Sequence, residues 1–177
     1  MFEGFFQTVP LAKKKEPFRT PRCSLCQLDQ HCNSPKIPVS GKGKRKVLIC
    51  GEAGGKNEDL QNLQFVGETG QLLEAALDRC GVNMREDCWI TNAVICRPSK
   101  EGKDRTPTDR EISYCQPNLI RAIKELNPKV IIPLGNSAIK SLFTWLWRSS
   151  KIGGIFRWAG FQIPCQQLNA WICPTFH

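Results

Sequence analysis

The residues best suited to chemistry in this sequence are its cysteines. The chain has ten of them among 177 residues, and it has no apolar signal region after its first lysines. We therefore expect a cytoplasmic protein with reduced thiols, in which a group of cysteines indicates metal ligation rather than disulfides. Cys23 and Cys26 have the two-residue spacing that lets two sulfurs reach one metal centre. We expect four cysteines to be ligands and six to be bystanders, several of them ordinary buried side chains.

Two further cysteines could complete such a centre. Cys96 follows a predicted strand, and Cys115 lies in a predicted helix. Neither has a close cysteine neighbour, which disfavours a zinc ribbon built from two paired motifs and suits an iron–sulfur cluster. Two alternatives stay open from the spacing alone. Cys96 and Cys115 could be plain packing residues, and Cys32 with His31 could supply a competing ligand pair.

A glycine-rich turn, Gly51-Glu-Ala-Gly-Gly55, follows the first predicted strand. It does not match a P-loop, because three residues instead of four separate Gly51 from the Gly55-Lys56 pair. Asn57 also stands where a Ser or Thr would bind magnesium, and the GxGxxG pattern of dinucleotide sites is absent. We interpret these glycines as a way of bringing backbone close to a flat or anionic ligand.

Alternating strands and helices must position these residues. Apolar runs predict strands over 47–50, 89–94, 130–134 and 170–173, and helical periodicity predicts helices over 68–80, 108–126 and 136–147. Thr108 and Glu111 have the spacing of a capping box, and Pro117 is expected to kink or break that helix. Residues 155–163 are predicted to form an exposed turn or hairpin around Gly160. The pattern predicts an α/β fold with three αβα layers and a central, mostly parallel four-stranded sheet.

The overall organisation and charge narrow the classes of function. Residues 1–22 are predicted to be an irregular N-terminal arm, and residues 23–177 a single domain. The net charge of +9 favours a polyanionic partner, and no apolar run reaches the length of about 18 residues that a membrane span needs. Ligands of parallel sheets bind beyond the carboxyl ends of the strands. Here those ends carry the glycine-rich turn, Asn92, Gly135 and His177.

Several spaced motifs resemble those of the iron–sulfur, or type-four, uracil-DNA glycosylases. The motifs are Gly51–Gly55 with Glu58-Asp59, Phe65–Gly67 with Gly70–Leu73, Ile90–Asn92 with Cys96–Pro98, Pro107 with Glu111 and Cys115, Lys129–Gly135, and Pro174–His177. They follow the order of the family, and the match runs from Cys23 to the last residue. The resemblance implies a DNA repair enzyme that flips uracil out of DNA and hydrolyses its N-glycosidic bond.

The resemblance also implies a cofactor and a partner. It assigns a 4Fe-4S cluster, of structural role, to Cys23, Cys26, Cys96 and Cys115. The expected partner is uracil-containing DNA, single or double stranded, bound by a monomer in the cytoplasm or at the nucleoid and without a membrane. Two interpretations stay open for the basic residues near the site: they could contact phosphates, or they could form an ordinary solvated basic surface. They are Lys42, Lys44, Arg45, Arg97, Lys100, Lys103 and Arg105.

Substrate-binding residues carry over from the family by motif. Phe65 is expected to stack on the uracil face. Asn92 is expected to read the uracil edge, because its amide can donate to one atom and accept from the neighbouring one. Glu52, Ala53 and Gly54 are expected to line the sugar and the uracil, largely through their backbone.

The catalytic residues implied by the resemblance are Asn92, His177 and Glu58. His177 is expected to donate to uracil O2 as negative charge develops on the leaving base. Glu58 is expected to order a water or to stabilise positive charge on the sugar. Because Asn92, His177 and backbone donors stabilise the uracil anion, no covalent nucleophile is needed.

Three features depart from the family pattern. Gly54 stands where the family usually has proline, which predicts a looser turn. The family's last motif continues past the histidine, so we interpret this sequence, which stops at His177, as C-terminally shortened. The segment 143–154 is longer than usual, and its purpose is not evident. The alternative function is a non-catalytic DNA-binding or interaction module that retains the glycosylase fold, with an active site incomplete after His177.

Overall fold

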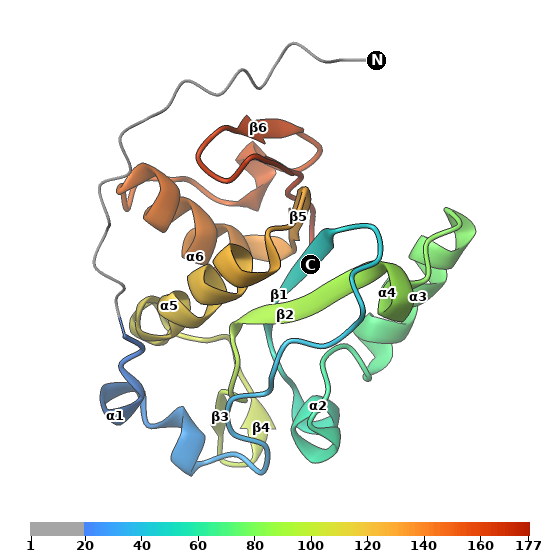
Figure 1. Cartoon of the computed structure of the whole chain (residues 1–177). Coiled ribbons are helices and arrows are strands. Elements are labelled where there is room, and N and C mark those ends of the chain that lie inside the picture. Colours follow the sequence, from blue (N-terminus) through green and yellow to red (C-terminus); the bar gives the residue numbers. More distant parts are fainter. Residues whose placement is uncertain (1–19) are drawn as a thin grey trace, which may run out of the picture.

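The computed structural model describes residues 20–177 (Figure 1). Within this range a five-stranded sheet has the order β2–β1–β5–β7–β6. The strands are β1 (Val47–Ala53), β2 (Cys88–Val94), β5 (Val130–Pro133), β6 (Ile163–Cys165) and β7 (Ala170–Ile172). Neighbouring strands are parallel except for β6 and β7, which are antiparallel. The predicted αβα class is confirmed, and the sheet has one strand more than the four predicted.

The additional strand changes the prediction for residues 155–163. That segment begins with the 3-10 helix η2 (Ile155–Arg157), in which Ile155 is buried. The hairpin turn lies further along, between β6 and β7, where Asn169 has a φ of 49°. The predicted exposed turn around Gly160 is confirmed, because residues 158–160 form a turn and Gly160 is exposed with a φ of 85°. Only the hairpin alternative is wrong, since the hairpin lies at β6 and β7. The sequence gives little signal for β6 because the strand is short and contains Pro164, which an edge strand tolerates.

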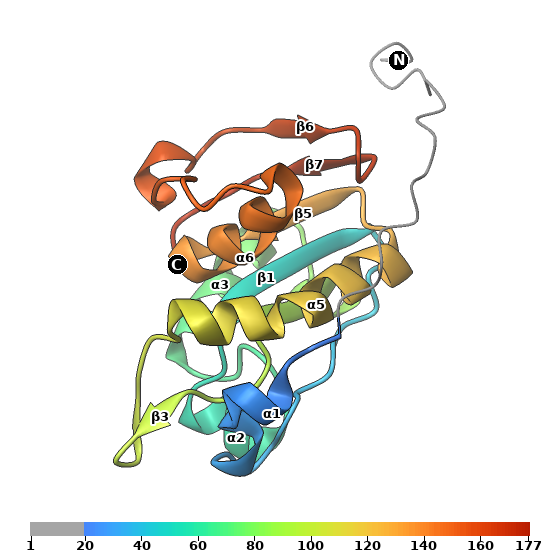
Figure 2. The same ribbon diagram turned by 90° about the vertical axis from the view of Figure 1, so that its left-hand side faces the viewer.

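Helices cover both faces of the sheet (Figures 1 and 2). On one face, α5 (Asp109–Leu126) and α6 (Gly135–Trp147) pack on β1 and β2, and their apolar residues form a core with Leu48 and Cys50. On the other face, Ile49 packs with Met84 and with apolar residues of α3 (Glu68–Arg79). Because successive side chains of a strand point to opposite faces, β1 is buried on both sides, as its continuous apolar run predicts.

The capping box at the start of α5 is confirmed. Thr108 Oγ1 accepts from the backbone N–H of Glu111 at 3.3 Å, and a Glu111 carboxylate oxygen accepts from the Thr108 N–H at 2.6 Å. The helix continues through Pro117 without a break. Proline there removes one backbone hydrogen bond, a loss that the packing of the buried α5 face outweighs.

Shorter elements complete the described chain. They are α1 (Cys23–Cys26), η1 (Leu28–Gln30), α2 (Lys56–Gln61), α4 (Met84–Asp87), β3 (Ser99–Lys100) and β4 (Lys103–Asp104). β3 and β4 form a small antiparallel hairpin beside α2. Among the helices of residues 20–177, none combines the length and apolar character needed to cross a bilayer. Most of the predicted arm, residues 1–19, lies outside the described residues, and the boundary at residue 23 stays a prediction.

Candidate active site and cysteine centre

The carboxyl ends of the parallel strands gather the predicted site residues at one edge of the sheet. Gly51 pairs with Asn92 across β1 and β2. At the next strands, Leu134 forms a bridge with Thr175, and the Gly135 N–H donates to the Thr175 carbonyl at 2.9 Å. Figure 2 shows the C-terminus at the same side of the molecule as the β3 hairpin. This is the edge at which ligands bind in parallel sheets.

Phe65 and Asn92 meet over Gly51. A Cβ atom at position 51 would lie 2.4 Å from Asn92 Oδ1 and 2.6 Å from Phe65 Cζ. Only glycine leaves room for both side chains, which explains the first glycine of the turn by close approach rather than by phosphate binding. The structure thus brings together the two residues predicted to recognise uracil, although they are distant in the sequence.

The Asn92 amide has no protein partner. Asn92 is 3% exposed, and within residues 20–177 its side chain takes part in no hydrogen bond. Its amide is not among the fully buried atoms of the described residues that lack a partner, so it remains accessible from outside the protein. An unpaired donor and acceptor beside an aromatic ring form a site that suits a planar, hydrogen-bonding ligand.

The loop that carries Phe65 is held rigidly. Phe65 has a φ of 54°, an uncommon conformation for an aromatic residue, and its ring is largely buried. Arg85 Nη2 donates to the carbonyls of Gln64 at 2.7 Å and Phe65 at 3.1 Å. A Cβ atom at Gly70 would lie 2.1 Å from the Phe65 carbonyl oxygen, so helix α3 also begins tightly against this loop. Arg85 was not predicted, because only the folded chain places it beside residue 65.

His177 lies at the same edge but beside β5 rather than β1. A Cβ atom at Gly135 would lie 2.7 Å from the His177 Cβ, and Gly135 has a φ of 77°. The histidine is exposed to solvent. Its known neighbour is Gly135 rather than the Phe65–Asn92 pair, and its predicted donation to uracil stays a prediction.

The four predicted cysteine ligands line one pocket. Cys23 and Cys26 come from α1, Cys96 from the segment after β2, and Cys115 from α5. The pocket has a volume of about 300 Å³, part of which is open to solvent, and its other walls include Leu28, Val94, Ile95 and Asn118. The predicted ligand cysteines, from three separate parts of the chain, therefore converge.

The chemistry of this pocket fits a cluster of several metal atoms. Three N–H groups point to its sulfurs: Lys36 N to Cys96 at 3.3 Å, and Ile95 N and Asn118 Nδ2 to Cys115, each at 3.5 Å. Such N–H donors stabilise the thiolate form of a cysteine. Burial has the opposite effect and raises the pKa of Cys96 to about 12. A cationic metal would therefore be needed to deprotonate this thiol. Within residues 20–177, no group of three His, Cys, Asp or Glu side chains is arranged to hold one single metal ion. A cluster binds each thiolate at a different iron and needs no such convergence.

The competing ligand pair is not part of the pocket. Cys32 lies beside Cys96, but neither Cys32 nor His31 is among the residues that line the pocket. Cys50 and Cys88 are buried in β1 and β2, as expected of cysteines that only pack.

Comparison with known proteins identifies the family. The model of the uracil DNA glycosylase superfamily matches residues 38–177. The chain belongs to the uracil-DNA glycosylase superfamily. It is 37% identical over 155 residues to the type-4 uracil-DNA glycosylase of Pyrobaculum aerophilum, covering 88% of this chain and 76% of the relative. The corresponding enzyme of Saccharolobus solfataricus is 32% identical over 156 residues, covering 88% and 70%. The predicted resemblance is confirmed.

Glu58 connects the glycine-rich turn to the loop that carries Phe65. Its Oε1 accepts from the N–H groups of Val66 at 3.0 Å and Gly67 at 2.8 Å, and its Oε2 accepts from that of Gly55 at 3.0 Å. Glu58 is thus a positioning residue for Phe65. Its predicted role toward the sugar stays a prediction.

Glu58→Gln is expected to lower the free energy of unfolding by about 1.5–3 kcal/mol, because the amide loses charge and turns a donor toward a backbone N–H. For a protein of this size the melting temperature should fall by about 4–10 °C. Differential scanning calorimetry measures this change. A slower uracil excision with an unchanged melting temperature would contradict the positioning role and favour direct catalysis.

Glu52 and Ala53 lie where β1 reaches the edge. Ser137, in the first turn of α6, donates its hydroxyl to Glu52 Oε2 at 2.6 Å, and Ser137 is 3% exposed. The N-terminus of α6 also stabilises the carboxylate through the helix dipole. Ala53 still pairs with Val94 in the sheet. Contact of these residues with substrate stays a prediction.

Gly54→Pro is expected to raise the free energy of unfolding by about 0.4–1 kcal/mol, because proline restricts the unfolded chain. The φ of Gly54 lies outside the left-handed region, and Ala53 before it is in a strand, which proline favours. A Cβ atom would approach Glu58 Cβ at 3.3 Å and Ile37 Cδ1 at 3.4 Å. Thermal melting checks this expectation, and a lower melting temperature would contradict it.

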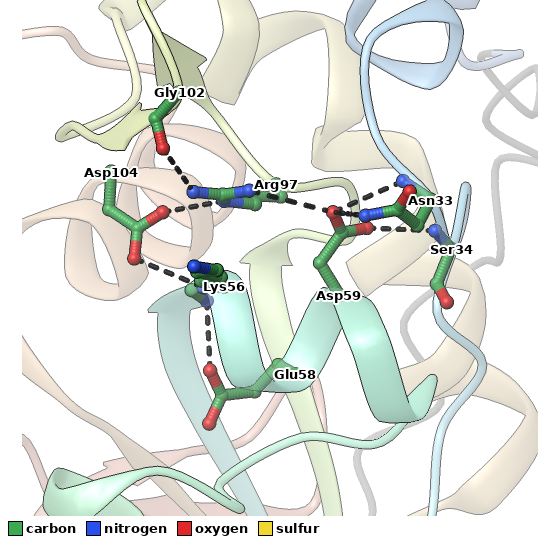
Figure 3. A network of polar contacts seen from close by, with 9 residues as sticks. Asn33, Ser34, Lys56, Glu58, Asp59, Arg97, Gly102 and Asp104 are labelled. Carbon is green, nitrogen blue, oxygen red and sulfur yellow. Dashed lines mark hydrogen bonds and ion pairs between the residues drawn. The ribbon is translucent and has the colours of Figure 1, made fainter.

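A partly buried polar network joins the segment of Asn33 and Ser34 to α2 and to the β3–β4 hairpin (Figure 3). Asp59, 1% exposed, accepts from the N–H groups of Asn33 at 3.1 Å and Ser34 at 2.8 Å and lies 3.8 Å from Arg97 Nη1. Arg97 Nε donates to Asp104 Oδ1, whose other oxygen accepts from the Lys56 N–H at 3.0 Å. The predicted phosphate contact of Arg97 is therefore wrong, since its guanidinium is buried and already bound.

Most of the other basic residues predicted to contact phosphates form ion pairs. Lys42 and Lys44 pair with Glu86, Arg45 with Asp87, and Arg105 with Glu111. Lys100 and Lys103, on the β3–β4 hairpin, are exposed and have no acidic partner in the described part of the chain. These two lysines can meet phosphates without breaking an existing contact.

Proposed function

We propose that this protein is a uracil-DNA glycosylase, a DNA repair enzyme that hydrolyses the N-glycosidic bond of uracil in DNA. One observation carries the proposal: the unpaired amide of Asn92 and the ring of Phe65 meet over Gly51. A base inside a DNA duplex is inaccessible, so the uracil must be swung out of the stack to reach this position.

Recognition follows from the groups at hand. The Phe65 ring offers a flat face for stacking, and the Asn92 amide offers one donor and one acceptor for the uracil edge. Cytosine presents an amino donor where uracil presents a carbonyl acceptor, so a fixed amide discriminates between them. Hydrogen bonds from Arg85 and to Glu58 fix the loop of Phe65, which reduces the entropic cost of keeping the ring in position beside Asn92.

Catalysis in this proposal is electrostatic. Cleavage leaves positive charge on the sugar and negative charge on the uracil, and Asn92 stabilises the uracil anion by donating to it. His177, at the same edge, supplies a second donor toward uracil O2. Glu52, Ala53 and Gly54 border the sugar, and the carboxylate of Glu58 favours its positive charge. Water then completes the hydrolysis without a covalent enzyme intermediate.

We further propose that Cys23, Cys26, Cys96 and Cys115 hold a 4Fe-4S cluster. The shared pocket, the N–H groups directed at its sulfurs and the type-4 relatives support this assignment. When bound, the cluster supplies a covalent cross-link between the segment at residue 23 and the sheet. Asp59 and Arg97 extend the connection from this centre to α2.

The proposed partner is uracil-containing DNA, with Lys100 and Lys103 in contact with its phosphates. The net charge of +9 supports a polyanionic partner. Action as a monomer, and a location in the cytoplasm or at the nucleoid, stay predictions.

The direct test uses labelled oligonucleotides with a single uracil, in single- and double-stranded form. After incubation with the protein, alkali cuts the strand wherever a base has been removed. We expect cleavage at the uracil and none in an oligonucleotide with thymine at that position. Binding of both oligonucleotides without cleavage would overturn the enzyme proposal and favour a non-catalytic DNA-binding module.

A further inference from the structure

Three phenylalanines near the C-terminal part of the chain are exposed to solvent. Phe156 is 89% exposed, Phe161 is 61% exposed and Phe176 is 52% exposed. Phe156 and Phe176 contact each other edge to face, with ring centroids 5.3 Å apart and an interplanar angle of 66°. Exposed aromatic rings in contact are costly in water, so they point to a ligand that covers them.

The exposed position of Phe156 is fixed by its surroundings. The Ile155 N–H donates to Asn136 Oδ1 at 2.8 Å, and the Trp158 ring nitrogen donates to the Ile152 carbonyl at 2.6 Å. Ile152 and Ile155 are each 5% exposed. The residues around Phe156 are therefore firmly packed, and the fold directs this ring outward.

The aromatic pair adjoins the candidate active site. Phe176 precedes His177, which packs against Gly135, and Asn136 is the next residue along α6. Figure 2 shows the segment of η2 next to the C-terminus, at the carboxyl edge of the sheet. A DNA strand that delivers a uracil to Asn92 would have its neighbouring nucleotides within reach of this edge.

The charge of the segment that carries the pair favours a polyanion. No Asp or Glu follows Glu125 in the sequence, whereas five Lys and Arg do. Of these, Arg157 is next to Phe156 in η2, and Lys140 is paired with Asp109. Arg157 lies over the ring of Trp158, with its guanidinium carbon 5.4 Å from the ring centroid. Aromatic rings among cations are typical of surfaces that bind single-stranded nucleic acid by stacking.

We propose that Phe156 and Phe176 form a stacking surface for the bases next to the extruded uracil in single-stranded DNA. This inference rests on the proposed function for its location, but it assigns residues outside the uracil pocket. Because every base has an aromatic face, the contact is independent of sequence.

The experiment measures the binding of a fluorescent single-stranded oligonucleotide without uracil by fluorescence anisotropy. Phe156→Ala is expected to raise Kd about 10-fold, and Phe156→Tyr is expected to restore it, because the ring is kept. Leu72→Ala is the control, since Leu72 on α3 is 68% exposed and should leave Kd unchanged. An unchanged Kd in Phe156→Ala would overturn the proposal. The proposal would also be overturned if Phe156→Ala and the wild type had the same Kd at high salt, because stacking does not depend on charge.

The outcomes separate this inference from the proposed function. Since the oligonucleotide contains no uracil, the binding result does not require excision. Uracil excision by the wild type with equal binding by Phe156→Ala would overturn only the stacking surface. Absence of excision with weaker binding by Phe156→Ala would overturn only the enzyme proposal.

Discussion

Asn92→Asp is expected to slow uracil excision by at least about 100-fold. Aspartate keeps the shape of the side chain but replaces the amide donor by an acceptor, and uracil presents a carbonyl oxygen at that point. The site would lose the donor that stabilises the leaving uracil anion and would gain repulsion between oxygens. Single-turnover excision from a uracil-containing oligonucleotide measures the effect.

The matched control for this prediction is Asn169→Asp. Asn169 is exposed in the turn between β6 and β7, with a left-handed φ of 49° that aspartate also tolerates. The same chemical change there should leave excision unaltered. Far-ultraviolet circular dichroism verifies that Asn92→Asp still folds. A folded Asn92→Asp variant with the wild-type rate would show that the amide does not recognise the base.

Cys115→Ser is expected to abolish the absorbance near ~400 nm and to remove most of the iron from the purified protein. Cys115 is buried in α5, and serine oxygen is a poor ligand for iron–sulfur iron. Loss of the cross-link to α1 should also destabilise the fold by several kcal/mol, which lowers the melting temperature by about 10 °C. Absorption spectra, iron and sulfide analysis, and thermal melting measure these effects.

Cys80→Ser is the control for the cysteine centre, because Cys80 is exposed at the end of α3, away from the pocket. It should keep the colour, the iron and the melting temperature. A brown Cys115→Ser protein with its full iron content would contradict the ligand assignment. A colourless wild type that contains zinc would contradict the cluster itself.

Local patterns predict the main framework of this protein. The Val47–Cys50 run is apolar because β1 is covered on both faces. The capping box of Thr108 and Glu111 depends only on residues three positions apart and not on the rest of the fold. Such signals depend on neighbours in the sequence. The edge strand β6 and the two-residue strands β3 and β4 have too few residues to carry a period, so they were missed.

The sequence by itself determined the order of the four main strands and the three long helices, the candidate cysteines and, through family motifs, the residues to examine for uracil recognition. Only the tertiary structure decided which of them meet. It brought Cys96 and Cys115 to the same pocket as the Cys23–Cys26 pair, and it buried Arg97 in ion pairs with Asp59 and Asp104. Contacts between distant segments depend on how whole layers pack, and spacing along a chain does not contain that information.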